Sequence, residues 1–321
     1  MILLTGSAGY IGSHISHILH KNKIKYIGID NLSRSSNKNI KYRKFFLKGD
    51  YGSAKLIKKI FSKHKIKTVI HCGAFAYVLD GEKQKRKYFI NNFTKSKTFF
   101  LLCKHQGIKN FIFLSSSNVY KDSDKKKKIN QKIKISEIKN NYGKTKYLFE
   151  KYLLSEKKEL DNLIILRLFN IAGYLKSFEY FEKKNLKYLR IIPLILIKFL
   201  EEKKLNIFFK KGKNNKIYPK RDYLHIKDLM DLLLIILSKI NNNRIKKIYN
   251  VGMGKKYSIK QILNYFNKEI KKNIKKKYQA IANEELISTL SDISTTKKDF
   301  KWKPKMRIKD IVQSSQNIKF R

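Results

Sequence analysis

Residues 3–15 read "LLTGSAGYIGSHI". Three glycines, Gly6, Gly9 and Gly12, follow an apolar run and precede a stretch with helical spacing. Glycine permits a tight turn and close approach of the main chain to a phosphate, while the start of a helix offers unpaired N–H groups. The spacing is G-x-x-G-x-x-G rather than the commoner G-x-G-x-x-G. It predicts a strand–turn–helix unit for a dinucleotide pyrophosphate. The alternative is a glycine-rich turn without a ligand.

The second candidate strand, "KYIGID", ends in Asp30, 24 residues after Gly6. A carboxylate at this place accepts hydrogen bonds from the adenosine ribose and repels the 2′-phosphate of NADP. Arg34 follows closely and could receive that phosphate. Because Asp30 lies at the strand end, we expect NAD rather than NADP. The alternative for Asp30 is a solvated turn carboxylate, since "IDNLS" suits a turn.

The first half of the chain alternates β-rich runs with amphipathic stretches. The helical spacing covers residues 11–19, 54–64 and 95–106, and the candidate strands are "MILLTG", "KYIGID", "KFFLKGD", "TVIHCGA", "NFIFLSS" and "NLIILRLFN". Such alternation predicts crossover units and an α/β fold. We therefore expect a Rossmann-type doubly wound parallel sheet with helices on both faces. Asp50, after the third run, would contact the adenine or cap a helix.

After about residue 172 the pattern becomes helical and less regular. Residues 221–240 predict a helix after a short extended piece, and residues 257–270 predict another helix. We expect an NAD-binding Rossmann domain at 1–172, with part of about 221–250 returning to it. Residues 173–321 would form a smaller C-terminal α/β domain that binds the substrate.

The composition narrows the classes of partner. The formal net charge is +50, from 74 Lys and Arg against 24 Asp and Glu. Nucleic acid or an anionic membrane would fit this charge, but the lysines are spread along the chain, which favours a solvated surface. The densest run, residues 121–134, predicts an exposed loop. The apolar run at 191–200 is too short to span a bilayer. Two cysteines without metal-ligand spacing favour a reduced, cytoplasmic location and no metal.

Two further segments carry candidate chemistry, "FIFLSSSNVY" at 111–120 and "NNYGKTK" at 140–146. On a helix, Tyr142 and Lys146 lie one turn apart. A phenol has a pKa near 10, and a nearby ammonium would lower it and favour the phenolate that a base requires. The spacing alone is weak, because the chain has 19 tyrosines, and a surface helix pair is the alternative.

Six segments in order resemble the extended short-chain dehydrogenase/reductase family, which includes the NAD-dependent epimerases and dehydratases. They are "TGSAGYIGSH", "GIDNLS", "FIFLSSSNVY", "YGKTK", "LRLFNIAG" and "RDYLHIKDL". The chain is most similar to members that epimerise C4 of UDP-glucose. The resemblance implies Tyr142 as the base, Lys146 lowering its pKa, and Ser116 as the hydroxyl that polarises the sugar oxygen, because the family places that hydroxyl four residues before Tyr120.

The resemblance also implies the binding residues. Besides Ser116, Tyr142 and Lys146, the cofactor would contact Gly6, Gly9, Tyr10, Ile11, Gly12, Asp30, Asn31, Leu32, Ser33, Arg34, Ser35, Asp50, Tyr51, Cys72, Gly73, Ala74, Phe75, Ala76, Asn91 and Phe169. Besides Ser116 and Tyr142, the nucleotide-sugar substrate would contact Asn170, Arg190, Arg221, Tyr223 and Asp292. Relatives commonly form homodimers, which makes a homodimer an expectation here.

The residues after Ser116 bear on the reaction. Sugar 4,6-dehydratases of the family carry an Asp-Glu pair there, whereas this chain has Ser117 and Asn118. We therefore expect epimerisation at C4 of a nucleotide sugar of the UDP-glucose/UDP-galactose type, through a 4-keto intermediate. One alternative is another nucleotide-sugar enzyme, such as a UDP-N-acetylhexosamine epimerase, a reductase or a dehydratase. The other is a non-catalytic NAD- or RNA-binding protein.

Because of three departures from the family, the nucleotide base and the sugar of the substrate stay open. Ala76 replaces a usual lysine, Arg190 falls where an asparagine pair is usual, and Ala282 replaces an arginine that pairs with the diphosphate. Arg190 or another cation could take over the lost phosphate contact.

Overall fold

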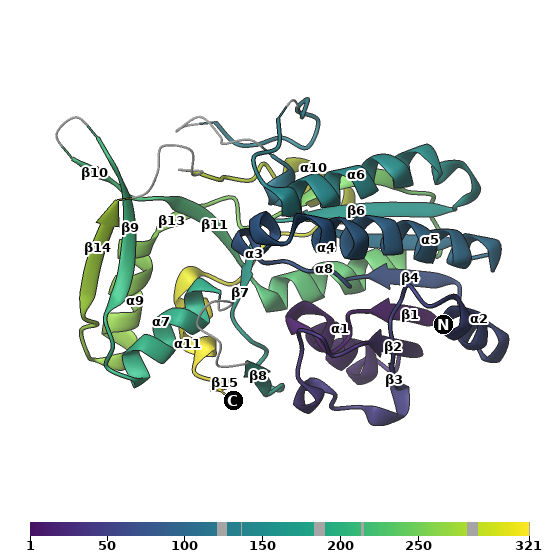
Figure 1. Cartoon of the computed structure of the whole chain (residues 1–321), viewed down its shortest axis with the longest axis horizontal. Coiled ribbons are helices and arrows are strands. Elements are labelled where there is room, and N and C mark those ends of the chain that lie inside the picture. Colours follow the sequence, from purple (N-terminus) through teal and green to yellow (C-terminus); the bar gives the residue numbers. More distant parts are fainter. Residues whose placement is uncertain (121–126, 136, 183–189, 213–214, 281–287, 321) are drawn as a thin grey trace. The chain divides into compact units, whose positions relative to one another are not determined.

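The computed structural model describes residues 1–120, 127–135, 137–182, 190–212, 215–280 and 288–320 (Figure 1). Two compact units interleave along the chain. Unit 1 comprises Met1–Tyr120, Ile135–Leu168 and Leu232–Tyr249, and unit 2 comprises Lys121–Lys134, Phe169–Asp231 and Asn250–Arg321. The assignment of cofactor and substrate binding to separate domains stays a prediction. In the described residues, no helix combines the length and the apolar character that a bilayer span requires.

Unit 1 is built on a seven-stranded sheet with the order β12-β6-β5-β4-β1-β2-β3. The strands are β1 (Ile2–Thr5), β2 (Tyr26–Asp30), β3 (Phe46–Lys48), β4 (Thr68–His71), β5 (Asn110–Ser116), β6 (Asn162–Leu168) and β12 (Lys246–Val251). The pairings from β3 through β6 are parallel. Successive strands run outward from β1 in one direction and from β4 in the other. The crevice at such a reversal is where doubly wound sheets bind ligands.

Helices cover both faces of this sheet. As a result, neighbouring strand residues, which point to opposite faces, are equally buried. Leu3 and Leu4 on β1, and Phe111 and Ile112 on β5, are all 0% exposed. The helices are α1 (Tyr10–Lys21), α2 (Ala54–Lys63), α3 (Val78–Lys83), α4 (Lys85–Phe89), α5 (Lys95–His105), α6 (Asn141–Ser155) and α8 (Ile226–Lys239), which begins in unit 2. The predicted Rossmann-type fold is confirmed.

Helices α2, α5 and α6 share one face of the sheet. Ile57 of α2, Phe99 of α5 and Phe149 of α6 enter the same apolar cluster as Leu3 and Phe111. Between α4 and α5 the chain forms a π-helical turn at Ile90–Thr94. Such turns insert a residue into the helical ladder and often occur at functional sites.

Unit 2 contains short strands as well as helices. The strands are β7 (Asn170–Ala172), β8 (Tyr180–Glu182), β9 (Leu205–Lys211), β10 (Lys216–Ile217), β11 (Lys220–His225), β13 (Lys256–Ser258), β14 (Lys276–Ala280) and β15 (Ile318–Phe320). The helices are α7 (Ile191–Leu200), α9 (Ile259–Ile270), α10 (Ser294–Phe300) and α11 (Ile308–Ser315). The strands form small sheets with the orders β10-β9-β14, β13-β11-β7 and β15-β8.

The helical character expected after residue 172 was therefore only partly right. The extended piece and helix at 221–240 are β11 and α8, and α9 lies within the predicted 257–270. The pair formed by β9 and β14 was missed. In β9, buried and exposed residues alternate, but its two terminal lysines and all five exposed residues of β14 hide the strand pattern. Of the predicted 121–134 loop, 121–126 lie outside the described residues, and Ile129 is buried rather than exposed.

Candidate active site

Ser116 ends β5, and Tyr142 and Lys146 lie in the first turns of α6. All three side chains are buried, with 6, 7 and 3% of their residue surface exposed. The helix begins at a fixed place because the side chain of Asn140 accepts a hydrogen bond from the main-chain N–H of Gly143 at 2.7 Å. Tyr142 and Lys146 are thus one helical turn apart, as predicted from their spacing.

Gly143 brings α6 close to the loop that follows Ser116. A Cβ atom built at Gly143 would lie 2.1 Å from the carbonyl oxygen of Asn118, closer than any side chain could come. Asn118 in turn donates hydrogen bonds to the Oγ of Ser116 from its main-chain nitrogen at 3.2 Å and from its Nδ2 at 3.0 Å. The glycine in "YGKTK" therefore allows Tyr142 and Ser116 to approach, a role that sequence reasoning missed.

Burial sets the ionisation of both candidate groups on α6. It raises the pKa of Tyr142 to about 12, although a hydrogen bond with Ser116 acts in the opposite direction. Burial also lowers the pKa of Lys146 to about 8, against the attraction of Cys72 and Glu150. The Lys146 Nζ donates to the carbonyl oxygen of Leu114 at 2.8 Å. In this state the phenol is neutral at physiological pH, so a base at Tyr142 requires added positive charge.

Asn92 supports helix α6 and was not predicted. Its amide donates to the carbonyl oxygen of Phe75 at 2.9 Å and accepts from the N–H of Phe75 at 2.8 Å. The same Nδ2 donates to the Oγ1 of Thr145 at 3.2 Å. Thr145 precedes Lys146, so Asn92 ties the loop after β4 to the middle of the Tyr142–Lys146 turn. The only sequence signal was the adjacent "NN" pair, because a π-helical turn has no clear pattern.

The glycine turn after β1 has the geometry of a phosphate cradle. Gly6 has a φ of +66°, and a Cβ atom there would lie 2.9 Å from the main chain of Gly73, which follows β4. A Cβ atom at Gly12 would lie 2.0 Å from the carbonyl oxygen of Gly6. Helix α1 begins directly after Gly9, which has no side chain to cap it. The N–H groups of its first turn are therefore suited to bind an anion.

Asp30 at the end of β2 is held against this turn. Its carboxylate accepts hydrogen bonds from the main-chain nitrogens of Ala8 at 3.1 Å and Leu32 at 2.8 Å, and from the Oγ of Ser35 at 2.9 Å. Leu32 has a φ of +61°, which folds segment 30–35 back toward the strand end. The predicted ribose-binding carboxylate and the predicted pyrophosphate turn are therefore neighbours.

Asp50 lies in a second group of cofactor candidates. Its carboxylate accepts from the N–H of Gly52 at 2.8 Å, from Asn31 at 3.2 Å and from the Nζ of Lys95 at 2.6 Å. Burial opposes ionisation, but these donors and the Lys95 charge hold the pKa of Asp50 below its usual range. Tyr51 is buried and its hydroxyl donates to the carbonyl oxygen of Asn91 at 2.5 Å.

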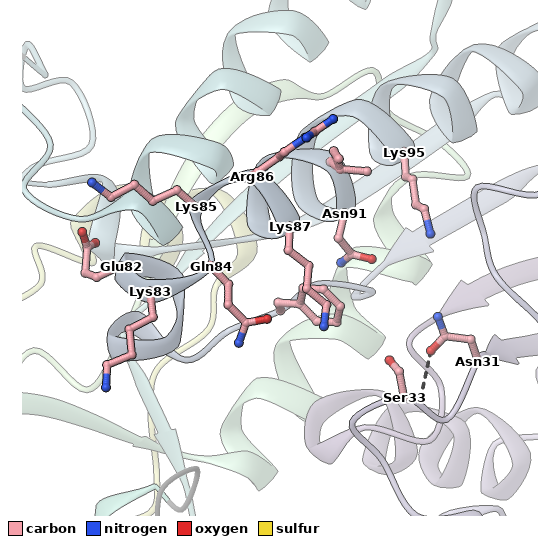
Figure 2. Close-up of a pocket in the computed structure, with 12 residues that line it drawn as sticks. Asn31, Ser33, Glu82, Lys83, Gln84, Lys85, Arg86, Lys87, Asn91 and Lys95 are labelled. Carbon is pink, nitrogen blue, oxygen red and sulfur yellow. Dashed lines mark hydrogen bonds between the residues drawn. The ribbon is translucent and has the colours of Figure 1, made fainter.

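A cavity of about 770 Å³ opens beside these residues (Figure 2). Figure 2 shows Gln84, Lys87 and Asn91 pointing into one space, with Asn31 and Ser33 on the facing side. The volume is in the range of nucleotide and cofactor pockets. The cavity is lined by Asn31, Ser33, Phe75, Glu82, Lys83, Gln84, Lys85, Arg86, Lys87, Ile90, Asn91 and Lys95. It therefore combines predicted cofactor residues with cationic side chains.

Three predicted substrate residues come together in unit 2. Strands β7 and β11 pair in parallel, which places Asn170 opposite Tyr223, and Arg221 lies on the same side of β11 as Tyr223. The Nδ2 of Asn170 donates to the carbonyl oxygen of Asp222 at 3.1 Å. Asp222, which was not predicted, is fully buried and accepts from Met253, Gly254 and Ser291.

The remaining predicted residues of unit 2 have local partners. Arg190 pairs with Glu182 at 2.5 Å, so its proposed phosphate contact would compete with this carboxylate. Asp292 accepts from Asn130 at 2.8 Å and from the N–H of Ser294 at 2.9 Å. Phe169 is buried, and its N–H donates to Val251 at 2.9 Å. Ala282 lies outside the described residues.

The sheet order, the glycine turn and the placement of Asp30 define a Rossmann-type dinucleotide-binding protein. The sequence matches the model of the NAD dependent epimerase/dehydratase family over residues 2–252. The chain belongs to this family, and its cofactor is NAD. The resemblance inferred from the six segments is thus confirmed. In the described residues, no group of three or more His, Cys, Asp or Glu side chains could hold a metal ion.

Individual relatives differ in the reaction that their names state. A UDP-glucose 4-epimerase of Pasteurella multocida is 30% identical over 320 residues, covering 94% of this chain and 92% of that protein. A dTDP-D-glucose 4,6-dehydratase of Dictyostelium discoideum is 34% identical over 272 residues, covering 78% of this chain and 58% of that protein. The crystal structure of a UDP-glucose 4-epimerase matches with a TM-score of 0.90 at 25% identity, covering 98 and 96% of the two chains.

Proposed function

We propose that the protein epimerises C4 of a nucleotide sugar of the UDP-glucose/UDP-galactose type, through a 4-keto intermediate. The observation that carries this proposal is the buried set of Ser116, Tyr142 and Lys146, where β5 and α6 approach each other through Gly143. Tyr142 and Lys146 are the base and the group that tunes it. The proposal is supported by the 30% identity to a full-length UDP-glucose 4-epimerase.

The residues present fit NAD. The turn leaves no room for a side chain at Gly6 or Gly12, the first turn of α1 offers N–H donors, and Asp30 presents a carboxylate beside them. We propose that these groups hold the pyrophosphate and the adenosine ribose. The chemistry that bound NAD supplies is reversible uptake of a hydride. The protein supplies the proton transfer, the orientation of the sugar and the exclusion of water.

Proton transfer is the role we propose for Tyr142. The phenolate removes the proton of the sugar C4 hydroxyl and returns it when the hydride comes back to the other face. Because burial raises the pKa of Tyr142 to about 12, the phenolate must be stabilised by the Lys146 ammonium and the positive charge of the cofactor. Ser116 hydrogen-bonds the same sugar oxygen. Asn170, Arg190, Arg221, Tyr223 and Asp292 are proposed to bind the rest of the nucleotide sugar.

A 4,6-dehydratase is the second candidate, because one relative at 34% identity bears that name. Removal of water across C5–C6 needs an additional acid and base. The two positions after Ser116 hold Ser117 and Asn118, and Asn118 uses its side chain to hydrogen-bond Ser116. Neither side chain titrates near neutral pH, so epimerisation is favoured. A reductase, a UDP-N-acetylhexosamine epimerase, the cytoplasmic location and the homodimer stay predictions.

The experiment that tests the function uses purified protein without added cofactor. It is mixed separately with UDP-glucose and UDP-N-acetylglucosamine, and the anomeric protons are followed by NMR. We expect the C4 epimer of one sugar to accumulate to equilibrium, and a Tyr142→Phe variant to form it far more slowly. A third mixture contains dTDP-glucose, and a new deoxysugar methyl signal in it would instead identify a dehydratase. Absence of both products would overturn the assignment to these substrates.

A further inference from the structure

Arg34, which the sequence raised as a possible ligand of a 2′-phosphate, is held by a carboxylate from another part of the cofactor-binding unit. Its Nη2 lies 2.5 Å from the Oδ2 of Asp80, 46 residues further along the chain. Its guanidinium carbon lies 4.8 Å from the centre of the Phe75 ring. Two contacts thus fix the direction of the side chain, while 26% of its surface stays exposed.

Asp80 is built to keep this contact. Its side chain is 1% exposed. The carboxylate also accepts from the Nε2 of Gln84 at 2.5 Å and from the hydroxyl of Tyr88 at 3.4 Å. Burial opposes ionisation, but the Arg34 guanidinium holds the pKa of Asp80 below its usual range. If Arg34 moved away, the buried carboxylate of Asp80 would lose its compensating charge. Breaking this ion pair is therefore costly in free energy.

The pairing matters because the chain is so basic. With 74 Lys and Arg against 24 Asp and Glu, cations are abundant and carboxylates are scarce. Two of the scarce carboxylates nevertheless neutralise cations beside the proposed adenosine site, Asp80 with Arg34 and Asp50 with Lys95. Without such pairing, a guanidinium four residues from Asp30 would attract the extra phosphate of NADP, since Arg binds phosphate through paired N–H donors.

We infer that Asp80 determines the choice between NAD and NADP by holding Arg34 away from the position of a ribose 2′-phosphate. Asp30 repels that phosphate directly, and Asp80 removes the cation that would offset the repulsion. Asp80 is therefore a specificity-determining residue that acts through Arg34. This inference rests on the proposed placement of the adenosine ribose at Asp30.

The test compares binding of NADH and NADPH by nicotinamide fluorescence, with protein from which bound nucleotide has been removed. The variants are Asp80→Asn, Glu159→Gln and the double variant Asp80→Asn/Arg34→Gln, all checked for folding by circular dichroism. Asp80→Asn should raise the affinity for NADPH relative to NADH by about tenfold or more, the scale of one added charge-assisted phosphate contact. Glu159→Gln removes a carboxylate that pairs with Lys104 rather than with Arg34, and should leave the ratio unchanged.

The double variant distinguishes Arg34 from neighbouring cations such as Lys87. A gain in NADPH affinity that depends on Arg34 should disappear in the double variant, whereas a gain that comes from another cation should persist. An unchanged ratio in Asp80→Asn, or a gain that persists in the double variant, overturns the inference. If Asp80→Asn does not fold, Arg34→Gln alone still decides. It should leave NADPH affinity unchanged, and a loss would show that Arg34 already serves the phosphate. Asp30→Ala tests the proposed site itself, since unchanged NADH affinity there would refute the cofactor placement and not the role of Asp80.

Discussion

The carboxylate of Glu150 accepts hydrogen bonds from the Nε of Arg167 at 3.1 Å and from its Nη2 at 2.6 Å, with both residues almost fully buried. Glu150 lies one turn beyond Lys146 on α6, and Arg167 lies on β6. The Oγ of Ser115 also donates to Glu150 at 2.5 Å, and Arg167 donates to the hydroxyl of Tyr120 at 2.9 Å. This network joins helix α6 to strands β5 and β6.

Glu150→Gln should therefore lower the free energy of unfolding strongly. It leaves the Arg167 charge buried without a counter-charge, a change that costs about 3–5 kcal/mol. The matched control is Glu156→Gln just beyond the end of α6, where the ion pair with Lys104 is partly exposed and surface pairs contribute about 0–1 kcal/mol. Urea unfolding curves measure both. Equal effects of the two substitutions would contradict the structural role of the buried pair.

Tyr142→Phe should reduce kcat for epimerisation by about 10²- to 10⁴-fold, the usual contribution of a positioned acid–base group. NADH affinity should change little, because the ring remains. Tyr147→Phe is the control, since Tyr147 lies on the same helix but is only half-buried. Rates from the NMR assay and affinities from fluorescence give the two readouts. A Tyr142→Phe variant with normal kcat would remove this residue from the mechanism.

Lys146 should make the stability of the nucleotide-free protein depend on pH. Burial lowers its pKa to about 8, below the 10.5 of the unfolded chain, so between these values the unfolded state binds more protons and stability rises with pH. Relative to Lys146→Met, the wild type should gain on the order of 2 kcal/mol from pH 8 to 10. Denaturant unfolding across this range measures the difference, and parallel curves for the two proteins would be inconsistent with a buried, depressed lysine.

Glu82 should affect catalysis through the start of α6. Its Oε1 accepts from the N–H of Asn141 at 2.7 Å, and its Oε2 accepts from the Asn141 side chain at 2.6 Å. Because Asn141 adjoins Tyr142, Glu82→Ala should lower kcat by roughly tenfold, less than the hundredfold cost of a 1 Å misplacement. Glu82→Gln, which keeps one acceptor, should recover part of the loss. If both variants change only stability and leave kcat intact, Glu82 does not position Tyr142.

Alanine substitutions at Gly12 and Gly9 should have different effects on stability and on cofactor binding. A Cβ atom at Gly12 would lie 2.0 Å from the Gly6 carbonyl oxygen, whereas one at Gly9 would lie 3.3 Å from the same atom. Gly12→Ala should therefore destabilise the nucleotide-free protein by about 1–3 kcal/mol or more, the usual cost of overpacking. Gly9→Ala should fold but bind NADH more weakly, because it adds a methyl group at the N-cap of α1, beside the proposed pyrophosphate site. Thermal unfolding and NADH titration separate the two effects, and a Gly12→Ala variant as stable as Gly9→Ala would refute the contact.

Much of unit 1 could be predicted because its signals are local. The parallel strands are buried on both faces, so β4, β5 and β6 appear as nearly continuous apolar runs. The glycine spacing of residues 6–12 and the one-turn separation of Tyr142 and Lys146 are also local. Short strands such as β14, whose residues are all exposed, gave no comparable signal, since their formation depends on the partner strand.

The sequence by itself therefore determined the Rossmann-type fold, the family and the candidate catalytic residues, because each was recognised from short motifs whose members lie close together in the chain. Only the tertiary structure decided which distant residues support them. Arg34 meets Asp80 across 46 residues, Asn92 meets Thr145 across 53, and Glu150 meets Arg167 on a neighbouring strand. Such contacts depend on the order of strands in the sheet and on burial, which set whether a charge is solvated or must find a partner. No spacing rule along the chain encodes them.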